Sequence, residues 1–247
     1  MRIGLFIPCF IDVFFPEVGI ATLELLERFG LEVIYPPDQT CCGQPMANSG
    51  FNAECADTEA LFVRNFSGFD YVVAPSGSCV HHVRDNFDAI EQSAEVKEVR
   101  TRTYELVEFL HDVLKADAFP WAHFPHRVGL HNSCQTLRRL KHAAPSELNE
   151  PYFSKPMDLL SKVAGIEFVT PARPDECCGF GGTFSVFEEA VSAKMGYDKV
   201  TDFTRAGAEY IVSADSSCLM HQQGCAERIG LPLKFIHIAQ ILNGAAT

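Results

Sequence analysis

Basic side chains are scarce in this sequence of 247 residues. It has 20 Lys and Arg against 32 Asp and Glu, which gives a formal net charge of -12 at pH 7. Phosphate groups are bound by clustered Lys and Arg, so this charge balance argues against a nucleic-acid partner. Acidic partners of other kinds are not expected either.

Long apolar runs are missing near the N-terminus. The segment MRIGLFIPCF carries one basic residue and a short apolar stretch, and Asp12, Pro16 and Glu17 follow soon after it. A membrane-spanning helix needs about 20 apolar residues, and a signal peptide joins a basic start to a longer apolar core. We therefore expect a cytoplasmic protein without a membrane span.

Patterns typical of hydrolytic enzymes are also absent from the sequence. It contains no nucleophilic triad signature, no HExxH motif and no pair of carboxylates placed for acid–base catalysis. Two polar groupings remain, and we interpret both as exposed helix faces. They are Glu105, Glu108 and His111 in TYELVEFLHDVL, and the basic run of Arg138, Arg139 and Lys141. Contact of the basic run with an anionic substrate or partner is the alternative.

Cysteine, in contrast, is abundant, with 10 residues in the chain. Disulfides rarely persist in the cytoplasm, so metal binding or redox chemistry is the first expectation for so many thiols. Buried thiols acting as small apolar side chains and a secreted disulfide framework are the alternatives. The chain length and the missing signal peptide weaken the second of these.

The chain repeats itself, and the repeat uses eight of the ten cysteines. Four pairs of segments align: residues 2–9 with 127–134, 25–36 with 159–171, Cys41-Cys42-Gly43 with Cys177-Cys178-Gly179, and 71–79 with 210–218. Each copy reads Cys, then Cys-Cys-Gly, then Cys-x-x-His. Cys55 and Cys225 have no counterpart in the alignment, so we interpret both as core or incidental thiols.

The repeat divides the chain into two halves of the same fold class. The boundary is predicted within ADAFPWAHFPH, which contains two prolines and lacks periodicity, and gives a first half of residues 1–120 and a second of 121–247. Strands are predicted at residues 3–7, 32–35, 71–74, 128–130, 167–169 and 210–213, and helices at 17–29, 53–66 and 185–206. Alternating strands and helices imply an α/β fold. We expect two pseudo-symmetric α/β lobes with small parallel sheets and one cysteine motif each.

In this arrangement, each cysteine of the repeat follows a predicted strand. Ligands gather at the carboxyl ends of parallel strands, and the helix N-termini that follow favour thiolates. Gly43 and Gly179 let the backbone approach sulfur and donate N–H hydrogen bonds, and Gly181 and Gly182 extend this in the second half. A phosphate-binding loop is the weaker interpretation of that glycine-rich run, because it lacks the Lys-Ser/Thr of a P-loop.

Four thiolates in each half suit an iron–sulfur cluster of the four-cysteine type. Structural zinc is the competing interpretation, although zinc ligands usually come from tight Cys-x-x-Cys knuckles rather than from loops spread along a domain. His82 and His221 lie three residues after the last cysteine of each copy. They could be ligands, proton relays or ordinary helix residues.

The two Cys-Cys-Gly sequences, together with CQTLR at residues 134–138 and CCGFGGTFS at 177–185, closely resemble the LutA/YkgE family of lactate-utilisation iron–sulfur proteins. The resemblance runs from Cys9 to the C-terminus. It extends to a wider group with the B subunit of heterodisulfide reductase and iron–sulfur subunits of glycolate- and glycerol-3-phosphate-oxidising systems. It implies a subunit that acts with LutB-like and LutC-like partners to oxidise L-lactate, a small 2-hydroxy acid, to pyruvate.

The resemblance also implies one cluster, expected to be 4Fe-4S, in each half. Its ligands would be Cys9, Cys41, Cys42 and Cys79 in the first half and Cys134, Cys177, Cys178 and Cys218 in the second. His82 and His221 stand where the heterodisulfide-reductase pattern has its last cysteine, which disfavours non-cubane clusters and disulfide reduction. The alternatives are an iron–sulfur subunit that oxidises another 2-hydroxy acid such as glycolate, a heterodisulfide-reductase-like redox subunit, and a zinc-stabilised interaction protein.

Overall fold

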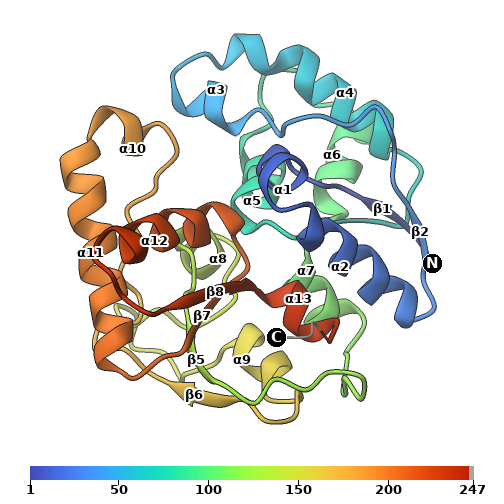
Figure 1. Cartoon of the computed structure of the whole chain (residues 1–247). Helices are drawn as coiled ribbons and strands as arrows, with labels where there is room; N and C mark the ends of the chain where they lie inside the picture. Colours follow the sequence, from blue (N-terminus) through green and yellow to red (C-terminus); the bar gives the residue numbers. More distant parts are fainter. Residues whose placement is uncertain (245–247) are drawn as a thin grey trace.

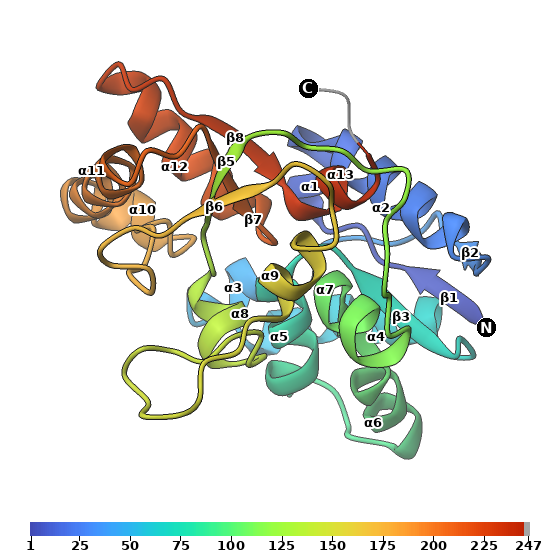
Figure 2. The same ribbon diagram turned by 90° about the horizontal axis from the view of Figure 1, so that it is seen from below.

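The structure, a computed structural model, describes residues 1–244, and this part of the chain contains two parallel four-stranded sheets. The first has the order β2-β1-β3-β4 and the second the order β6-β5-β7-β8. The strands are β1 (Arg2–Leu5), β2 (Glu32–Ile34), β3 (Tyr71–Ala74), β4 (Thr103–Glu105), β5 (Arg127–Leu130), β6 (Glu167–Val169), β7 (Tyr210–Ser213) and β8 (Lys234–His237). The two sheets lie in separate halves of the molecule (Figure 2). The predicted α/β fold with two similar lobes is therefore confirmed.

All six predicted strands form, with shifts of a few residues at their ends, but each sheet has a fourth strand that the sequence did not predict. The interpretation of Glu105, Glu108 and His111 as a solvated helix face is wrong for the two glutamates. Glu105 is fully buried in the strand Thr103–Glu105 beside β3, and Glu108 is 7% exposed. Residues 106–113 are helical as expected, and the strand runs directly into them, so the helical spacing of the acidic residues dominated the pattern.

Helices connect the strands and cover both sheets (Figure 1). They are α1 (Cys9–Phe14), α2 (Pro16–Arg28), α3 (Gln44–Asn48), η1 (Ala53–Cys55), α4 (Ala56–Phe66), α5 (Gly77–Asn86), α6 (Ala94–Thr101), α7 (Leu106–Glu108), the π-helix η2 (Phe109–Val113), α8 (Cys134–Arg138), α9 (Lys155–Leu160), α10 (Phe184–Phe187), α11 (Glu189–Arg205), α12 (Ser216–Arg228) and α13 (Ile238–Leu242). The three predicted helices correspond to α2, η1 with α4, and α10 with α11. Arg138, Arg139 and Lys141 are exposed as predicted, although α8 ends at Arg138.

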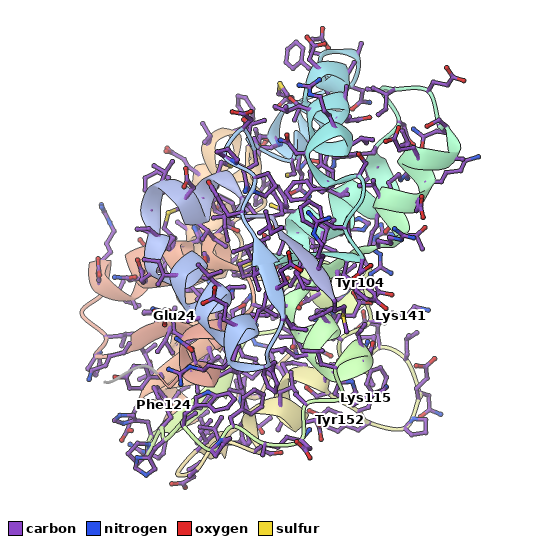
Figure 3. The ribbon with its side chains drawn as sticks, turned by 90° about the vertical axis from the view of Figure 1, so that its right-hand side faces the viewer. Glu24, Tyr104, Lys115, Phe124, Lys141 and Tyr152 are labelled. Carbon is purple, nitrogen blue, oxygen red and sulfur yellow. The ribbon has the colours of Figure 1, made fainter. Side chains whose placement is uncertain are left out.

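The two lobes exchange helices across their boundary. The last helix, α13, follows the second sheet but packs against α2 of the first lobe, while α7 follows the first sheet and packs against α9 of the second. Figure 3 labels Glu24 on α2, whose carboxylate accepts a hydrogen bond of 2.6 Å from Asn243 Nδ2 at the end of α13. Trp121 Nε1 donates to the Leu242 carbonyl at 2.8 Å. The lobes therefore share one core, while the predicted division at residues 120 and 121 stays a prediction.

A close contact between α5 and α8 joins the lobes near the cysteines. Gly77 is the first residue of α5, and a Cβ atom there would overlap Thr136 Cγ2 of α8. We expect Gly77→Ala to lower the free energy of unfolding by about 1–3 kcal/mol, because overpacking forces backbone shifts. Denaturant midpoints measured anaerobically test this.

Gly224→Ala is the matched control, since its Cβ would meet no atom within 4 Å among the described residues. Alanine inside the exposed part of α12 should raise the free energy of unfolding by about 0.5–1 kcal/mol. Equal midpoints for the two variants would contradict the tight contact.

Candidate metal centre

Four of the eight repeat cysteines lie in the first turns of helices that follow strands, and the two Cys-Cys pairs lie in loops. Cys9 and Cys134 are the first residues of α1 and α8, soon after β1 and β5. Cys79 and Cys218 are the third residues of α5 and α12, after β3 and β7. These helices meet in the middle of the molecule (Figure 1). Their N-terminal N–H groups carry partial positive charge, which favours thiolates.

The eight thiols form two groups of four. In the first lobe, Cys9 Sγ lies 3.6 Å from Cys41 Sγ, and Cys42 is hydrogen-bonded to both Cys41 and Cys79. In the second lobe, the same chain of thiol contacts joins Cys134, Cys177, Cys178 and Cys218. The structure thus brings together the eight cysteines proposed as ligands from the sequence.

One thiol in each group ionises far more readily than its neighbours. Hydrogen bonds from Cys42, from Cys9 and from the Gly43 N–H lower the pKa of Cys41 to about 2. Cys134, Cys178 and the Gly179 N–H lower the pKa of Cys177 to about 2 in the same way. The neighbouring thiols donate to this thiolate, and their own pKa values are raised. Ionising all four thiols in one buried place requires a cation, which is what a metal centre provides.

Two glycines supply backbone donors to sulfur. The Gly43 N–H donates to Cys41 Sγ and the Gly179 N–H donates to Cys177 Sγ, both at 3.4 Å. Their φ angles of 92° and 94° lie in the left-handed region, which explains why glycine follows each cysteine pair. Gly181 and Gly182 line the space between the two cysteine groups.

That space is a cavity of about 180 Å³, and residues of both lobes line it. Its wall contains Asp215, which is 1% exposed and accepts hydrogen bonds from groups on both lobes. The donors are Ser76 Oγ, Ser78 N and Oγ, and Ser133 Oγ. Burial raises the pKa of Asp215 despite these donors. The sequence analysis did not identify Asp215 as a site residue. It aligns with Ser76 in the repeat, so it is a position at which the two copies differ.

His82 and His221 lie against the glycine of their own Cys-Cys-Gly sequence. A Cβ atom on Gly43 would lie 3.6 Å from His82 Nε2, and one on Gly179 would lie 3.3 Å from His221 Nε2. His221 Nε2 is 3.2 Å from the Ser192 carbonyl oxygen, whereas His82 Nε2 has no hydrogen-bond partner in residues 1–244. Burial lowers the pKa of His82 to about 4. Both histidines therefore flank the thiol groups in equivalent places.

Cys55 and Cys225 are buried, in agreement with their interpretation as core thiols. Cys55 Sγ lies 3.6 Å from the Gly43 carbonyl oxygen. In the second lobe, Ser192 Oγ donates to the Gly179 carbonyl at 2.8 Å. Cys55 thus has a spatial counterpart in Ser192 rather than in another cysteine.

A third histidine, His131, lies within the second thiol group. The sequence analysis did not identify it as a site residue. One ligand atom from each of His131, Cys178 and Cys218 lies within 4.8 Å of the other two. His131 is 1% exposed, and burial lowers its pKa to about 3. The sequence feature that could have identified His131 is a polar residue directly after an apolar strand, at the position that aligns with Phe6 in the first copy.

The donor atoms suit a soft metal or a metal–sulfur cluster. Thiolate ligands select zinc and iron–sulfur clusters over hard cations, and N–H donors to sulfur are typical partners of such ligands. Each lobe therefore offers a four-sulfur site that fits either group. Separately, no helix within residues 1–244 is both long enough and apolar enough to cross a membrane.

Comparison with known proteins gives matches over both lobes. The model of the CCG cysteine-rich domain family matches residues 3–84 and 128–223. The chain is 41% identical to lactate utilization protein A of Geobacillus kaustophilus (strain HTA426), over 98% of this chain and 99% of that protein. It is also 41% identical to lactate utilization protein A of Exiguobacterium sp. (strain ATCC BAA-1283 / AT1b), with 98% and 97% covered.

A solved structure shares the fold at low sequence identity. It is the crystal structure of a hypothetical protein from Helicobacter pylori, with a TM-score of 0.59 and 11% identity. The match covers 98% of this chain and 48% of that chain, so this chain spans about half of the longer protein. This likeness concerns the fold alone.

Proposed function

This chain belongs to the lactate utilization protein A family of CCG cysteine-rich domain proteins, and from that premise we propose that it is an iron–sulfur electron-transfer subunit of an L-lactate-oxidising system. The observation that carries the proposal is that both four-thiol groups contribute cysteines to the lining of one cavity. Cys41 and Cys42 line it from the first lobe, and Cys134 and Cys218 from the second. Two centres that share a cavity are close enough for electrons to pass between them, whereas structural zinc sites have no need to face one another.

A 4Fe-4S cluster in each lobe would supply one-electron transfer, which lactate oxidation to pyruvate requires twice. The residues of this chain would hold and tune such clusters. N–H groups of Gly43 and Gly179 donate to sulfur, and helix N-termini offset negative charge. A four-thiolate donor set also binds structural zinc, so the support for clusters over zinc comes from the family membership and from the cavity that the two thiol groups share.

Lactate itself is poorly matched to the cavity. Among the described residues that line it there is no Lys, Arg or His, and its one ionisable carboxyl group is Asp215. A carboxylate substrate would meet no cationic partner there. We therefore place substrate oxidation on a LutB-like or LutC-like partner subunit, with this chain carrying the electrons.

Apolar side chains beside the cavity offer a surface for such a partner. Val13 and Phe14 on α1 are 66% and 59% exposed, and Val186 and Phe187 on α10 are 72% and 77% exposed. Helix α1 begins at Cys9, and α10 follows the cavity-lining residues Gly181 and Gly182 in the chain. Phe10, which also lines the cavity, contacts Phe180 at a ring distance of 5.7 Å. Exposed apolar clusters of this kind are typical of protein interfaces.

Anaerobic purification tests the proposal. The visible absorption spectrum and the iron, sulfide and zinc contents would be measured before and after dithionite. We expect a brown protein with iron and sulfide for two clusters that bleaches on reduction. A colourless protein with stoichiometric zinc would overturn the electron-transfer function, and a substrate screen with the partner subunits separates lactate from glycolate.

A further inference from the structure

Phe6 and His131 occupy the same place in the two lobes. Each follows the last residue of its first strand, β1 or β5. The Phe6 N–H donates to the Val73 carbonyl at 2.9 Å, and the His131 N–H donates to the Val212 carbonyl at 2.8 Å. Because the backbone has the same hydrogen bond at both positions, the two side chains extend from equivalent places. The two candidate metal sites therefore differ in this side chain.

The side chains around these two positions also differ in polarity. In the first lobe, Phe6 packs against Phe62 and Phe66 of α4, at ring distances of 5.0 and 5.7 Å. Phe66 contacts the strand glycine Gly4, and Phe203 of α11 contacts the equivalent glycine, Gly129, so Phe203 is the counterpart of Phe66. Lys199, four residues earlier on α11, is then the counterpart of Phe62. Phe6 is thus packed against two phenylalanines, whereas a lysine replaces one of them in the second lobe.

Lys199 does not satisfy the imidazole of His131. Its Nζ donates to the carbonyl oxygens of Arg173 and Pro174, at 3.0 and 2.9 Å. Neither ring nitrogen of His131 has a hydrogen-bond partner within the part of the chain that the structure describes. Buried polar atoms are almost always paired, so an imidazole with two free nitrogens indicates a partner outside the protein.

The geometry points to that partner being the metal centre of the second lobe. We propose that His131 is a nitrogen ligand of the group held by Cys178 and Cys218. Among the described residues, no histidine lies equally close to two cysteines of the first lobe, so the second centre would have a nitrogen donor without a counterpart in the first. The inference rests on the proposed function and extends it. It makes the two centres chemically distinct although their cysteine motifs are alike.

A difference in reduction potential follows. A 4Fe-4S cluster takes one protein ligand per iron, so His131 would replace one of the four thiolates of the second lobe. Imidazole is neutral where that thiolate is negative, and histidine ligation in place of cysteine is associated with a higher reduction potential in iron–sulfur centres. The second centre should therefore accept electrons more readily than the first, which would favour flow from the first lobe to the second.

Pulsed EPR of the anaerobic, partly reduced full-length protein, labelled with ¹⁵N-histidine, tests the ligand assignment. We expect strong ¹⁵N coupling in the signal of one centre, and loss of this coupling in both His131→Phe and His131→Gln. His131→Phe copies the residue of the first lobe, and His131→Gln keeps a polar side chain if phenylalanine is not tolerated. Phe6→Leu is the matched control and should keep the coupling.

A redox titration of the same samples gives a second readout. His131→Phe is expected to shift the midpoint potential of the coupled centre downward and leave the other centre unchanged. Two clusters without strong nitrogen coupling would overturn the ligand assignment and leave the proposed function intact. Coupling that survives in His131→Phe but disappears in His221→Phe would overturn it as well. A protein without iron would overturn the proposed function and this inference together.

Discussion

Replacing Cys42 with serine is expected to remove the metal of the first lobe and leave that of the second in place. Cys42 is 2% exposed and is hydrogen-bonded to both Cys41 and Cys79, so it lies at the centre of its thiol group. A serine hydroxyl is a hard and weakly acidic donor that replaces thiolate poorly as a ligand of iron. The iron content should fall to about half of the wild-type value, because sites in different lobes load separately.

Cys178→Ser is the reciprocal variant and should remove the other half of the iron. Cys55→Ser and Cys225→Ser are matched controls, since both thiols are buried and donate to backbone carbonyls, of Gly43 and Ala193. We expect both controls to keep their full iron content. Loss of all iron in Cys42→Ser alone would show that the eight thiols form one joint centre, and unchanged iron would contradict the assignment of Cys42 as a ligand.

Acidification is expected to destabilise the fold through buried neutral histidines that lie away from the cysteine groups. Burial lowers the pKa of His142 to about 3 and that of His237 to about 4. Glu105 lies 3.6 Å from His142 but supplies no compensating charge, because burial raises its own pKa well above the usual range. Both imidazoles therefore stay neutral in the folded protein at pH 5.5.

The unfolded chain takes up these protons near pH 6.5, whereas the folded chain does so only near pH 3 to 4. Stability is therefore fully present above pH 6.5 and is lost as the pH falls toward the folded pKa values. Between pH 7.5 and 5.5, each histidine should cost about 1.4 kcal/mol of unfolding free energy, or about 3 kcal/mol for the pair. That is a large part of the stability of a typical domain.

The buried Glu105 carboxyl has the opposite effect, because its raised pKa keeps it protonated in the folded chain while the unfolded chain ionises it. The histidine contribution is therefore measured as the difference in denaturant midpoints between wild type and histidine variants at the two pH values. His142→Gln should reduce the loss by about 1.4 kcal/mol, because the unfolded chain then gains one proton fewer. His123 is exposed, so His123→Gln is the matched control and should leave the pH dependence unchanged. A loss of the same size in wild type and His142→Gln would show that His142 is not a buried neutral group.

The repeat predicted most of the fold because it is a local pattern. Segments such as 71–74 and 210–213 are β-branched runs bounded by turn residues, and both form the strands expected of them. The fourth strand of each sheet was not predicted, because no local pattern distinguishes it. Thr103–Glu105 and Lys234–His237 run directly into α7 and α13, so no turn residues mark where they end. They are strands because a parallel neighbour pairs with them.

The composition of the two thiol groups was determined by the sequence alone. Matching Cys-Cys-Gly motifs after matching strands place four thiols at one sheet edge in each lobe, since parallel strands all end on the same side. What only the tertiary structure decided is how the lobes meet. The shared cavity, Asp215 in its wall, His131 among the thiols and the exchange of α7 and α13 depend on contacts between residues far apart in the chain. Such contacts leave no periodicity in the sequence, because they are selected by packing in three dimensions rather than by neighbours along the chain.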